Sequence, residues 1–468
     1  MTGGCRLPKT AGMSTASPAL PLTRASIFAQ AWPIMLGQAS IPLVGIVDAA
    51  VIGRTGDAAA LAGVALGATV ISLVFWSFGF LRMGMTGLTA QAQGAGEQAE
   101  VEALLLRALA IGGAIGLTLM ALAWPIVHLA FAMLAGGEAV TEEASGYATA
   151  RFFGAPAALG TFAINGWLLG LGRTRAALGL QLVVNAANIG LDLLFVWGLG
   201  MGATGVGIGT AGAEWIALAC GLLVAGRVAG GGLVEMARRT GRARLLDRAA
   251  LVRLFAVNRD IMIRTLALLL LFTWFANSGA RLGAVSLAAN HVLMQFISLA
   301  AFVLDAFAFT AESRIGQALG AKSRGQFTRA VRLTGEFSAC AGAALALLFW
   351  MGGEAVITFI TTDAAVRAEA TRFLPFAALV PLVGMPSWLL DGIFIGATAG
   401  RALRIAAVVA TVLYLALDTA LRPLGNLGVW WAFTASYPFR AAALGWHWPA
   451  LLRSLESPGE LAPAMKRR

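Results

Sequence analysis

The sequence predicts an all-α polytopic membrane protein with 12 transmembrane helices in two pseudo-symmetric six-helix bundles. Three observations predict this fold class. Hydrophobic residues make up 59% of the 468 residues and charged residues only 12%, so the mean hydropathy is +0.79. Apolar runs recur along the whole chain, many of them close to the ~20 residues that cross a bilayer as a helix. The second half of the chain also repeats the first.

Each half of the chain contains six of the twelve candidate spans. In the first half they cover 26–53, 61–86, 104–134, 147–171, 176–198 and 205–226. In the second half they cover 260–280, 287–313, 334–360, 373–397, 405–421 and 428–450. An even number of spans places both termini on one side of the membrane.

The Lys and Arg residues decide which side that is, because cytoplasmic loops are enriched in them. If the N-terminus is inside, the inner loops and the tail hold most of these residues, and the outer loops hold only scattered ones such as Arg54 and Arg422. We therefore expect both termini in the cytoplasm. The predicted domains are a cytoplasmic tail (1–24), an N-lobe (25–226), a basic cytoplasmic linker (227–259), a C-lobe (260–452) and a second cytoplasmic tail (453–468).

The internal repeat has an offset of 226 residues. Gln91-Ala-x-Gly-Ala falls on Gln317-Ala-x-Gly-Ala, and Asp192 falls on Asp418. Matches of Gln and Asp carry weight in a chain rich in Ala and Leu. Two six-helix repeats enter the membrane from the same side, so their symmetry axis follows the membrane normal, as in transporters whose substrate site lies between the halves.

Several acids lie inside the apolar spans of the first half, where a charged carboxylate costs about 2.5–3.5 kcal/mol on insertion scales. Asp48 comes late in the first span, and Asn188 and Asp192 come late in the fifth, one helical turn apart on one face. Thr210 comes early in the sixth span, which starts outside. The four side chains share a depth, so the sequence allows one cluster in the outer half of the N-lobe.

Such a cluster has two chemical uses. Two neighbouring carboxylates cannot both stay ionised cheaply, so one of them binds a proton. Alternatively, carboxylate, amide and hydroxyl oxygens are suitable hard ligands for Na⁺. The structural alternative is that Asn188 and Asp192 only join helices through hydrogen bonds, and Asn185 on the same stripe is open to both interpretations.

The acids of the second half give a weaker signal. Asp305 and Asp391 share the inner half of the C-lobe, where they could contact a cationic substrate or a second proton. A structural role as partners of a nearby Arg such as Arg314 is equally open. Glu312 and Asp418 lie near the predicted helix ends, where we expect them to be solvated. In the first half, the position of Glu214 is ambiguous between a structural and a functional role.

Other chemistry is not indicated. The three cysteines are scattered without CxxC spacing, so neither a disulfide framework nor a metal site follows. The net charge of +11 is explained by cytoplasmic loops rather than by nucleic acid. No phosphate-binding loop is present, so we expect neither ATP nor a cofactor, but only H⁺ or Na⁺ as a coupling ion. The expected partners are small organic molecules and membrane lipids, with the chain working as a monomer.

Three stretches resemble the multidrug and toxic compound extrusion (MATE) family, and most closely its DinF-like branch. They are VDAAVIGRTG at 47–56, NAANIGLDLLFVWG at 185–198 and LAANHVLMQFISLAAFVLDAFAFTAESRIGQALGAK at 287–322. The resemblance covers about residues 25–450. It implies a V-shaped pair of six-helix bundles in a bacterial-type inner membrane. It also implies antiport, in which an organic and often cationic compound leaves as H⁺ or Na⁺ enters.

The resemblance also implies roles for particular residues. The family's first-lobe cation site is matched by Asp48, Asn188, Asp192 and Thr210, with Pro33 and Pro42 allowing the first helix to bend. Asp391 resembles one acid of a second-lobe Na⁺ site. The seventh span, however, reads TLALLLLFTWFANSGA without an acid. This favours coupling in the first lobe, by H⁺ more than by Na⁺.

Two other functions compete with a cation-coupled exporter. A lipid-linked precursor flippase of the same superfamily would favour a strongly basic central cavity, whereas Arg82 is the main deep basic residue in the predicted spans. An integral-membrane acyl- or prenyltransferase is less favoured, because the DxxD-like acid clusters of prenyltransferases are missing. We therefore predict a transporter and not an enzyme.

Overall fold

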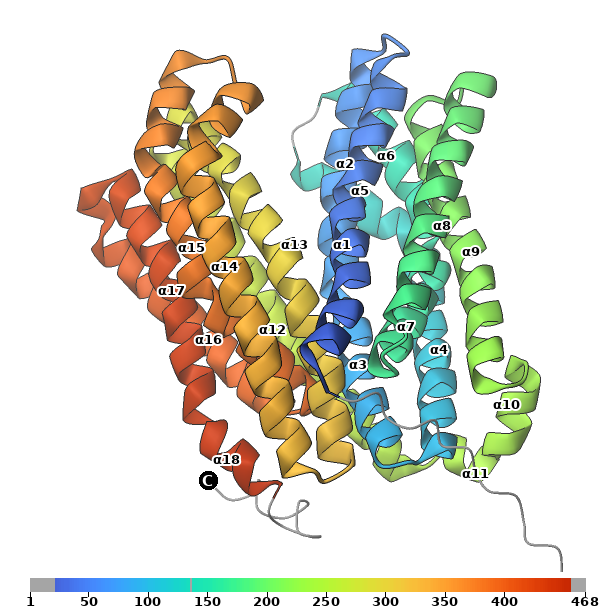
Figure 1. Cartoon of the computed structure of the whole chain (residues 1–468). Coiled ribbons are helices and arrows are strands. Elements are labelled where there is room, and N and C mark those ends of the chain that lie inside the picture. The colour runs from blue at the N-terminus through green and yellow to red at the C-terminus, as the bar shows by residue number, and fades with distance from the viewer. Residues whose placement is uncertain (1–21, 135–136, 456–468) are drawn as a thin grey trace, which may run out of the picture.

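The computed structural model describes residues 22–134 and 137–455, and these residues form helices without any strand. Most of the predicted N-terminal tail (1–24) and C-terminal tail (453–468) lies outside this range. Figure 1 shows two groups of helices that lie apart at one end and meet at the other. The N-lobe comprises α1 to α9 and the C-lobe α12 to α17, and their exact domain boundaries stay predictions.

The N-lobe starts with α1, a 30-residue helix with Pro33 and Pro42 inside it. Three predicted spans of this lobe, 61–86, 104–134 and 147–171, each consist of two shorter helices. In the last two a proline accompanies the break: one helix ends just before Pro125, and another carries Pro156 in its first turn. A proline is tolerated only in the first turn of a helix without disturbing the hydrogen-bond ladder. The helices are α1 (Arg24–Gly53), α2 (Ala58–Ser77), α3 (Phe80–Gly94), α4 (Gln98–Ala121), α5 (Ala123–Met133), α6 (Glu138–Phe152), α7 (Ala155–Gly170), α8 (Thr174–Asp192) with the π-helical turn η1 (Leu193–Gly198), and α9 (Gly202–Ala229).

The predicted linker is largely helical. It contains α10 (Leu233–Thr240) and α11 (Arg242–Leu245), and α12 (Arg248–Arg281) already begins within it. The other helices of the second half are α13 (Ala284–Gly320), α14 (Arg324–Ile360), α15 (Ala364–Gly396), α16 (Gly400–Ala420), the short η2 (Arg422–Leu424), α17 (Asn426–Trp446) and α18 (Trp448–Arg453).

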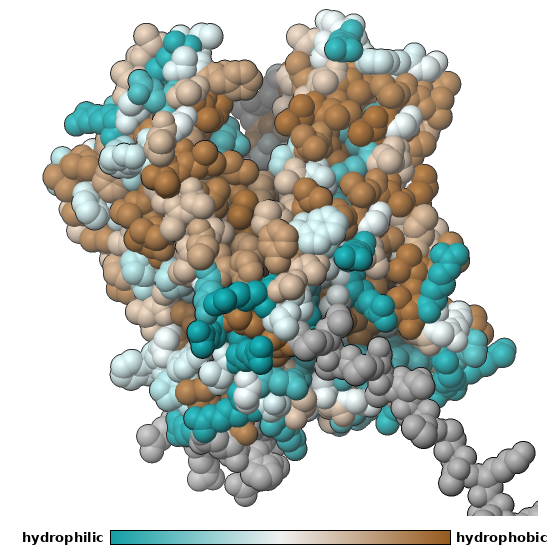
Figure 2. Space-filling view, in the orientation of Figure 1, coloured by the Kyte–Doolittle hydropathy of each residue, from teal (hydrophilic) through white to brown (hydrophobic). Residues whose placement is uncertain are grey.

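The helices account for the predicted spans. Among the described residues, ten helical segments are long and apolar enough to cross a membrane, and the pair α6 and α7, bent by 52°, gives an eleventh. The twelfth predicted span coincides with α17, which packs against α15 and α16. The predicted helical membrane architecture is therefore confirmed, with one span bent. Figure 2 shows a broad apolar band across the visible face of both lobes and hydrophilic residues towards both ends.

The two ends of the molecule differ. We call the end where α1 begins and α18 ends the terminal end, and there the lobes touch. We call the opposite end, where α8 ends and α13 begins, the far end, and there Figure 2 shows a notch between the lobes. The contact at the terminal end is made chiefly by α3 against α13. The molecule is thus a V that opens at the far end.

The internal repeat is visible in that contact. A Cβ on Gly94 of α3 would meet the backbone oxygen of Gln317, and a Cβ on Gly320 of α13 would meet that of Gln91. The Gln91 amide donates to the Gly396 carbonyl at 3.0 Å, and 226 residues on, the Gln317 amide donates to the Gly170 carbonyl at 3.1 Å. The matched Gln and Gly residues therefore serve one purpose, which is to let two helix backbones touch across the pseudo-twofold axis.

Candidate functional site

The predicted N-lobe cluster comes together from three helices. Asp48 lies late in α1, Asn188 and Asp192 lie one turn apart in α8, and Thr210 lies near the start of α9. Helix α8 packs against both α1 and α9. Asn188 and Asp192 are 0% exposed, Asp48 is 8% exposed and Thr210 is 9% exposed. The cluster therefore lies inside the lobe, near its far end, and does not face hydrocarbon.

Asn188 is the centre of the hydrogen bonds in this cluster. Its amide nitrogen donates to a carboxylate oxygen of Asp192 at 3.2 Å and to the hydroxyl of Thr210 at 3.0 Å. The Thr210 hydroxyl in turn donates to the Val206 carbonyl at 2.9 Å. The Asp48 carboxyl lies next to both Asp192 and Asn188. All four predicted side chains thus belong to one site.

The site keeps acceptor oxygens that no protein group satisfies. One carboxylate oxygen of Asp48, one of Asp192 and the amide oxygen of Asn188 are buried without a hydrogen-bond partner. Buried acceptors are rarely left so. Gly209 of α9 contributes to this arrangement, because a Cβ there would collide with the Asp192 carboxylate. The residues present fit a proton shared between two carboxyls, or a small hard cation bound by three oxygens.

Two other predicted N-lobe residues lie outside this cluster. Asn185 accepts a hydrogen bond from Gln181 at 3.0 Å and donates to the Ser40 carbonyl at 3.3 Å, so it joins α8 to α1. Glu214 forms a 2.9 Å ion pair with Arg151 of α6. Sequence reasoning missed Arg151, although a basic residue inside a predicted span was a signal for it. Its guanidinium is close enough to the two aspartates to act on both electrostatically.

The C-lobe acids meet arginines from other helices. Asp391 of α15 is 2.5 Å from a guanidinium nitrogen of Arg264 and 3.7 Å from one of Arg440. Asp305 of α13 shares the electrostatic environment of Asp391, Arg264 and Arg440. The structure thus brings Asp305 and Asp391 together. The arginines that accompany them are Arg264 of α12 and Arg440 of α17, and Arg82 of α3 also acts on Asp305. Arg314, the suggested partner, is not among them.

Two expectations from the sequence are wrong. Glu312 and Asp418 are not solvated: they are 1% and 2% exposed. Glu312 is buried because α13 continues to Gly320, well past the predicted end of its span. Asp418 is enclosed because the indole of Trp274 and the hydroxyl of Ser278 donate to it at 2.9 and 3.0 Å, with Arg281 at 3.4 Å.

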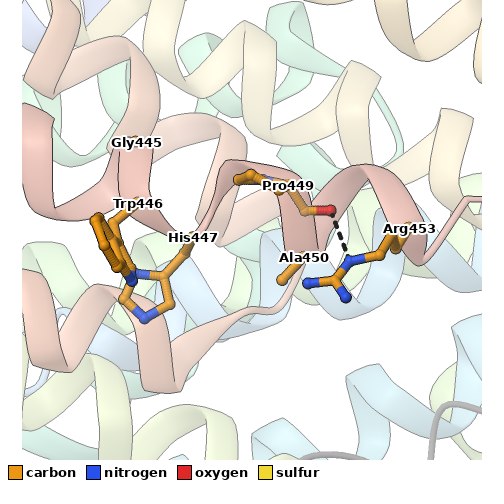
Figure 3. A pocket seen from close by; sticks show the side chains of 6 residues that line it. All are labelled: Gly445, Trp446, His447, Pro449, Ala450 and Arg453. Carbon is orange, nitrogen blue, oxygen red and sulfur yellow. Dashed lines mark hydrogen bonds between the residues drawn. The ribbon is translucent and has the colours of Figure 1, made fainter.

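No metal cluster competes with these sites in the part of the chain that the structure describes. Within residues 22–134 and 137–455, no three His, Cys, Asp or Glu side chains come together as metal ligands. A shallow hollow at the terminal end is lined by residues of α17 and α18, with Arg453 donating to the Pro449 carbonyl at 3.4 Å (Figure 3). It contains no acid and lies at the end opposite the N-lobe cluster. We therefore assign no role to it.

A helical membrane protein of two repeated lobes, with buried acids in each and a notch between them, has the architecture of a secondary transporter. The comparisons with known proteins identify the kind of transporter. The MatE family model matches residues 33–194 and 261–419, and the chain belongs to this family. The predicted resemblance is therefore confirmed, as is the prediction of a multi-pass transporter that is not an enzyme.

Individual relatives agree with that assignment. The chain is 36% identical over 419 residues to DNA damage-inducible protein F of Escherichia coli, covering 89% of this chain and 90% of the relative. It is 30% identical over 358 residues to the probable multidrug resistance protein NorM of Aromatoleum aromaticum, covering 74% of each. The bent form of the Vibrio cholerae MATE transporter VcmN has the same fold, with a TM-score of 0.79 at 19% identity over 92% of this chain and 97% of that one. An outward-facing multidrug resistance MATE family transporter gives 0.83 at 18% identity, over 93% and 97% of the two chains.

Proposed function

We propose that this protein exports small organic compounds, drugs among them, in exchange for H⁺ or Na⁺. The observation that carries the proposal is the pair of buried carboxyls, Asp48 and Asp192, with one unpartnered oxygen each beside that of Asn188. Burying two acids with unsatisfied oxygens inside a membrane-embedded lobe costs free energy, and a cation bound there offsets that cost. A proton or Na⁺ bound at Asp48, Asn188, Asp192 and Thr210 is the coupling step, and no other cofactor is required.

The coupling site belongs to the N-lobe because two acids of the C-lobe, Asp391 and Asp418, already have fixed positive partners. Asp391 lies against Arg264 at 2.5 Å, and Asp418, the repeat counterpart of Asp192, lies 3.4 Å from Arg281. A guanidinium cannot leave as a transported ion does. The carboxyl pair of Asp48 and Asp192 favours H⁺ over Na⁺, since two adjacent acids readily share one proton.

Alternating access follows from the V shape. The lobes part at the far end and meet at the terminal end, where α3 crosses α13 (Figure 1). Cation binding near the far end of α1 and α8 changes the packing of α1, in which Pro33 and Pro42 already interrupt the hydrogen-bond ladder. The basic residues at the terminal end favour a cytoplasmic position for both termini, and we propose that the protein works as a monomer in the inner membrane of a bacterial-type cell.

A lipid-linked precursor flippase is less well supported. Three arginines do lie between the helices, which is more than the sequence indicated: Arg440 is buried, and Arg82 and Arg264 are partly buried. Each of them lies near an acid, however: Glu312 for the first and Asp391 for the other two. The interior is therefore mixed in charge rather than strongly basic, which favours an exporter of organic compounds.

Dye efflux in everted membrane vesicles tests the proposal. We expect ethidium accumulation to depend on an imposed pH gradient, or on an imposed Na⁺ gradient, and to disappear in Asp48→Asn. Glu142→Gln serves as the matched control because Glu142 is an exposed acid at the start of α6. Accumulation that survives dissipation of both gradients, or that is equal in Asp48→Asn and wild type, would overturn the proposal.

A further inference from the structure

One face of α13 carries an aromatic ring between two acids. Asp305, Phe309 and Glu312 are spaced four and three residues apart, so they lie on one side of the helix. That side meets the N-lobe, since α13 packs against α1 and α3, and Phe309 belongs to an apolar cluster with Ile34 and Leu169. This stripe is the contribution of the C-lobe to the interface between the lobes.

Glu312 on this stripe is buried but poorly satisfied. It is 1% exposed, and both of its carboxylate oxygens lack a hydrogen-bond partner. Its nearest cation is Arg82 of α3, with 3.9 Å between the closest nitrogen and oxygen. In contrast, Asp391 nearby is held by Arg264 at 2.5 Å. The C-lobe therefore makes fewer polar contacts with the Glu312 carboxylate than with that of Asp391.

Arg82 lies where a flat organic cation would bind. The central carbon of its guanidinium is 4.0 Å from the centroid of the Phe309 ring, and one of its nitrogens is buried without a hydrogen bond. An aromatic face next to a carboxylate is the arrangement by which proteins recognise organic cations. The guanidinium, planar and weakly hydrated, resembles such a ligand.

The two halves of this contact belong to different lobes. Arg82 moves with α3, and Phe309 and Glu312 move with α13. If the lobes separate at the terminal end, as alternating access requires, the α3–α13 contact opens and the guanidinium withdraws from the ring and the carboxylate. Glu312 then faces the inward-facing opening without its partner cation, so its carboxylate is available to an organic cation that enters from that side.

We propose that Phe309 and Glu312 form a binding site for flat organic cations, and that Arg82 is its built-in competitor. Arg82 fills the site when the terminal end is closed, leaves it when that end opens, and displaces the bound compound towards the far end when the lobes close again. The inference rests on the proposed export by alternating access. It adds the residues that bind the compound and the residue that drives its release.

Equilibrium binding of ethidium to the purified full-length protein in detergent tests this inference. Arg82→Gln removes the competitor, so we expect ethidium to bind at least about tenfold more tightly. Arg82→Lys keeps a charge without the flat guanidinium and is expected to bind a few-fold more tightly than wild type. When Glu312→Gln is combined with Arg82→Gln, we expect the gain in ethidium affinity to disappear. When Phe309→Leu is combined with Arg82→Gln, we expect that gain to become smaller. Arg54→Gln, an exposed arginine at the far end, is the control and should leave binding unchanged.

Each outcome decides the inference. Unchanged or weaker ethidium binding in folded Arg82→Gln, or a gain that persists without Glu312, would overturn it. If Arg82→Gln does not fold, Arg82→Lys gives the same test, because an affinity at or below that of wild type contradicts competition. Gradient-driven efflux in vesicles is measured separately. Efflux that persists while Arg82 has no effect on binding would refute this site and leave the proposed antiport standing.

Discussion

The crossing of α3 and α13 predicts a specific effect of adding one methyl group. Gly94 approaches the backbone oxygen of Gln317 so closely that a Cβ has no room, so Gly94→Ala forces the two helices apart. Overpacking costs typically 1–3 kcal/mol. Here the neighbour is a backbone carbonyl that cannot swing aside, which places the cost at about 2–3 kcal/mol. Because the methyl group is accommodated when the lobes separate, the equilibrium should shift towards the state open at the terminal end by a factor of about 100.

Distance measurements by electron paramagnetic resonance between two spin labels would show this shift. Gln98 and Gln326 are exposed at the terminal end, one in each lobe, and are labelled as cysteines after Cys5, Cys220 and Cys340 are replaced by serine. We expect one short distance in the parent protein and a second, longer distance in Gly94→Ala. That longer distance should hold a large share of the population.

The pseudo-symmetry of the crossing supplies the check on this reasoning. Gly320 meets the backbone oxygen of Gln91 in the same way, so Gly320→Ala should produce the same longer distance. Gly113→Ala is the control, because nothing lies within 4 Å of a Cβ at that position. If neither Gly94→Ala nor Gly320→Ala alters the distances, the crossing does not hold the lobes together.

Three further substitutions have defined outcomes. Asn290→Leu removes the partner, at 2.8 Å, of the Asn426 amide oxygen and of the Trp430 indole. Thermal unfolding in detergent should therefore show a loss of about 1–3 kcal/mol. Trp274→Phe removes the 2.9 Å donor to the buried Asp418 and should cost about 1.5–3 kcal/mol in the same assay. Gly209→Ala places a methyl group on the Asp192 carboxylate, so gradient-driven efflux should fall sharply in vesicles with normal protein levels.

Matched controls separate these effects from general damage. Trp446 is 85% exposed, so Trp446→Phe should leave the unfolding temperature unchanged. A Cβ added at Gly190 of α8 would have nothing within 4 Å of it, so Gly190→Ala should transport normally. Equal losses in a variant and its control would show that the assigned contacts do not matter.

The N-lobe cluster was accessible from sequence because it depends on regular helix geometry. Asn188 and Asp192 share a face whatever surrounds them, since residues four apart in a helix always do. The depth of Asp48 and Thr210 follows from counting residues along spans that run in opposite directions. The hydrogen bonds from Asn188 then connect it to Asp192 on its own helix, α8, and to Thr210 on the adjacent helix, α9.

The ion pairs could not be predicted in the same way. Arg264 and Asp391 are far apart in sequence, and only the packing of α12 beside the other C-lobe helices brings them to 2.5 Å. Arg440 joins the same acid from α17 at 3.7 Å. Helical periodicity places a side chain on a face but does not say which helix that face meets.

Helix ends were a second source of error. A hydropathy run ends where polar residues begin, so the eighth span was expected to end at 313 and Glu312 to be solvated. The helix α13 instead continues to Gly320, because its last turns pack against α3 through small residues such as Gly316. Burial by a neighbouring protein helix, rather than by lipid, cannot be read from hydropathy.

The central claim is that a cation bound by Asp48 and Asp192 moves opposite to the exported compound. Proteoliposomes with an imposed ethidium gradient and no ion gradient test it most directly, with a pH-sensitive dye and radioactive Na⁺ reporting ion flux. We predict that ethidium movement drives H⁺ or Na⁺ the other way in wild type and in Glu142→Gln, and that Asp192→Asn abolishes the ion flux. If the ion flux per ethidium molecule is the same in Asp192→Asn as in wild type, that result contradicts the account.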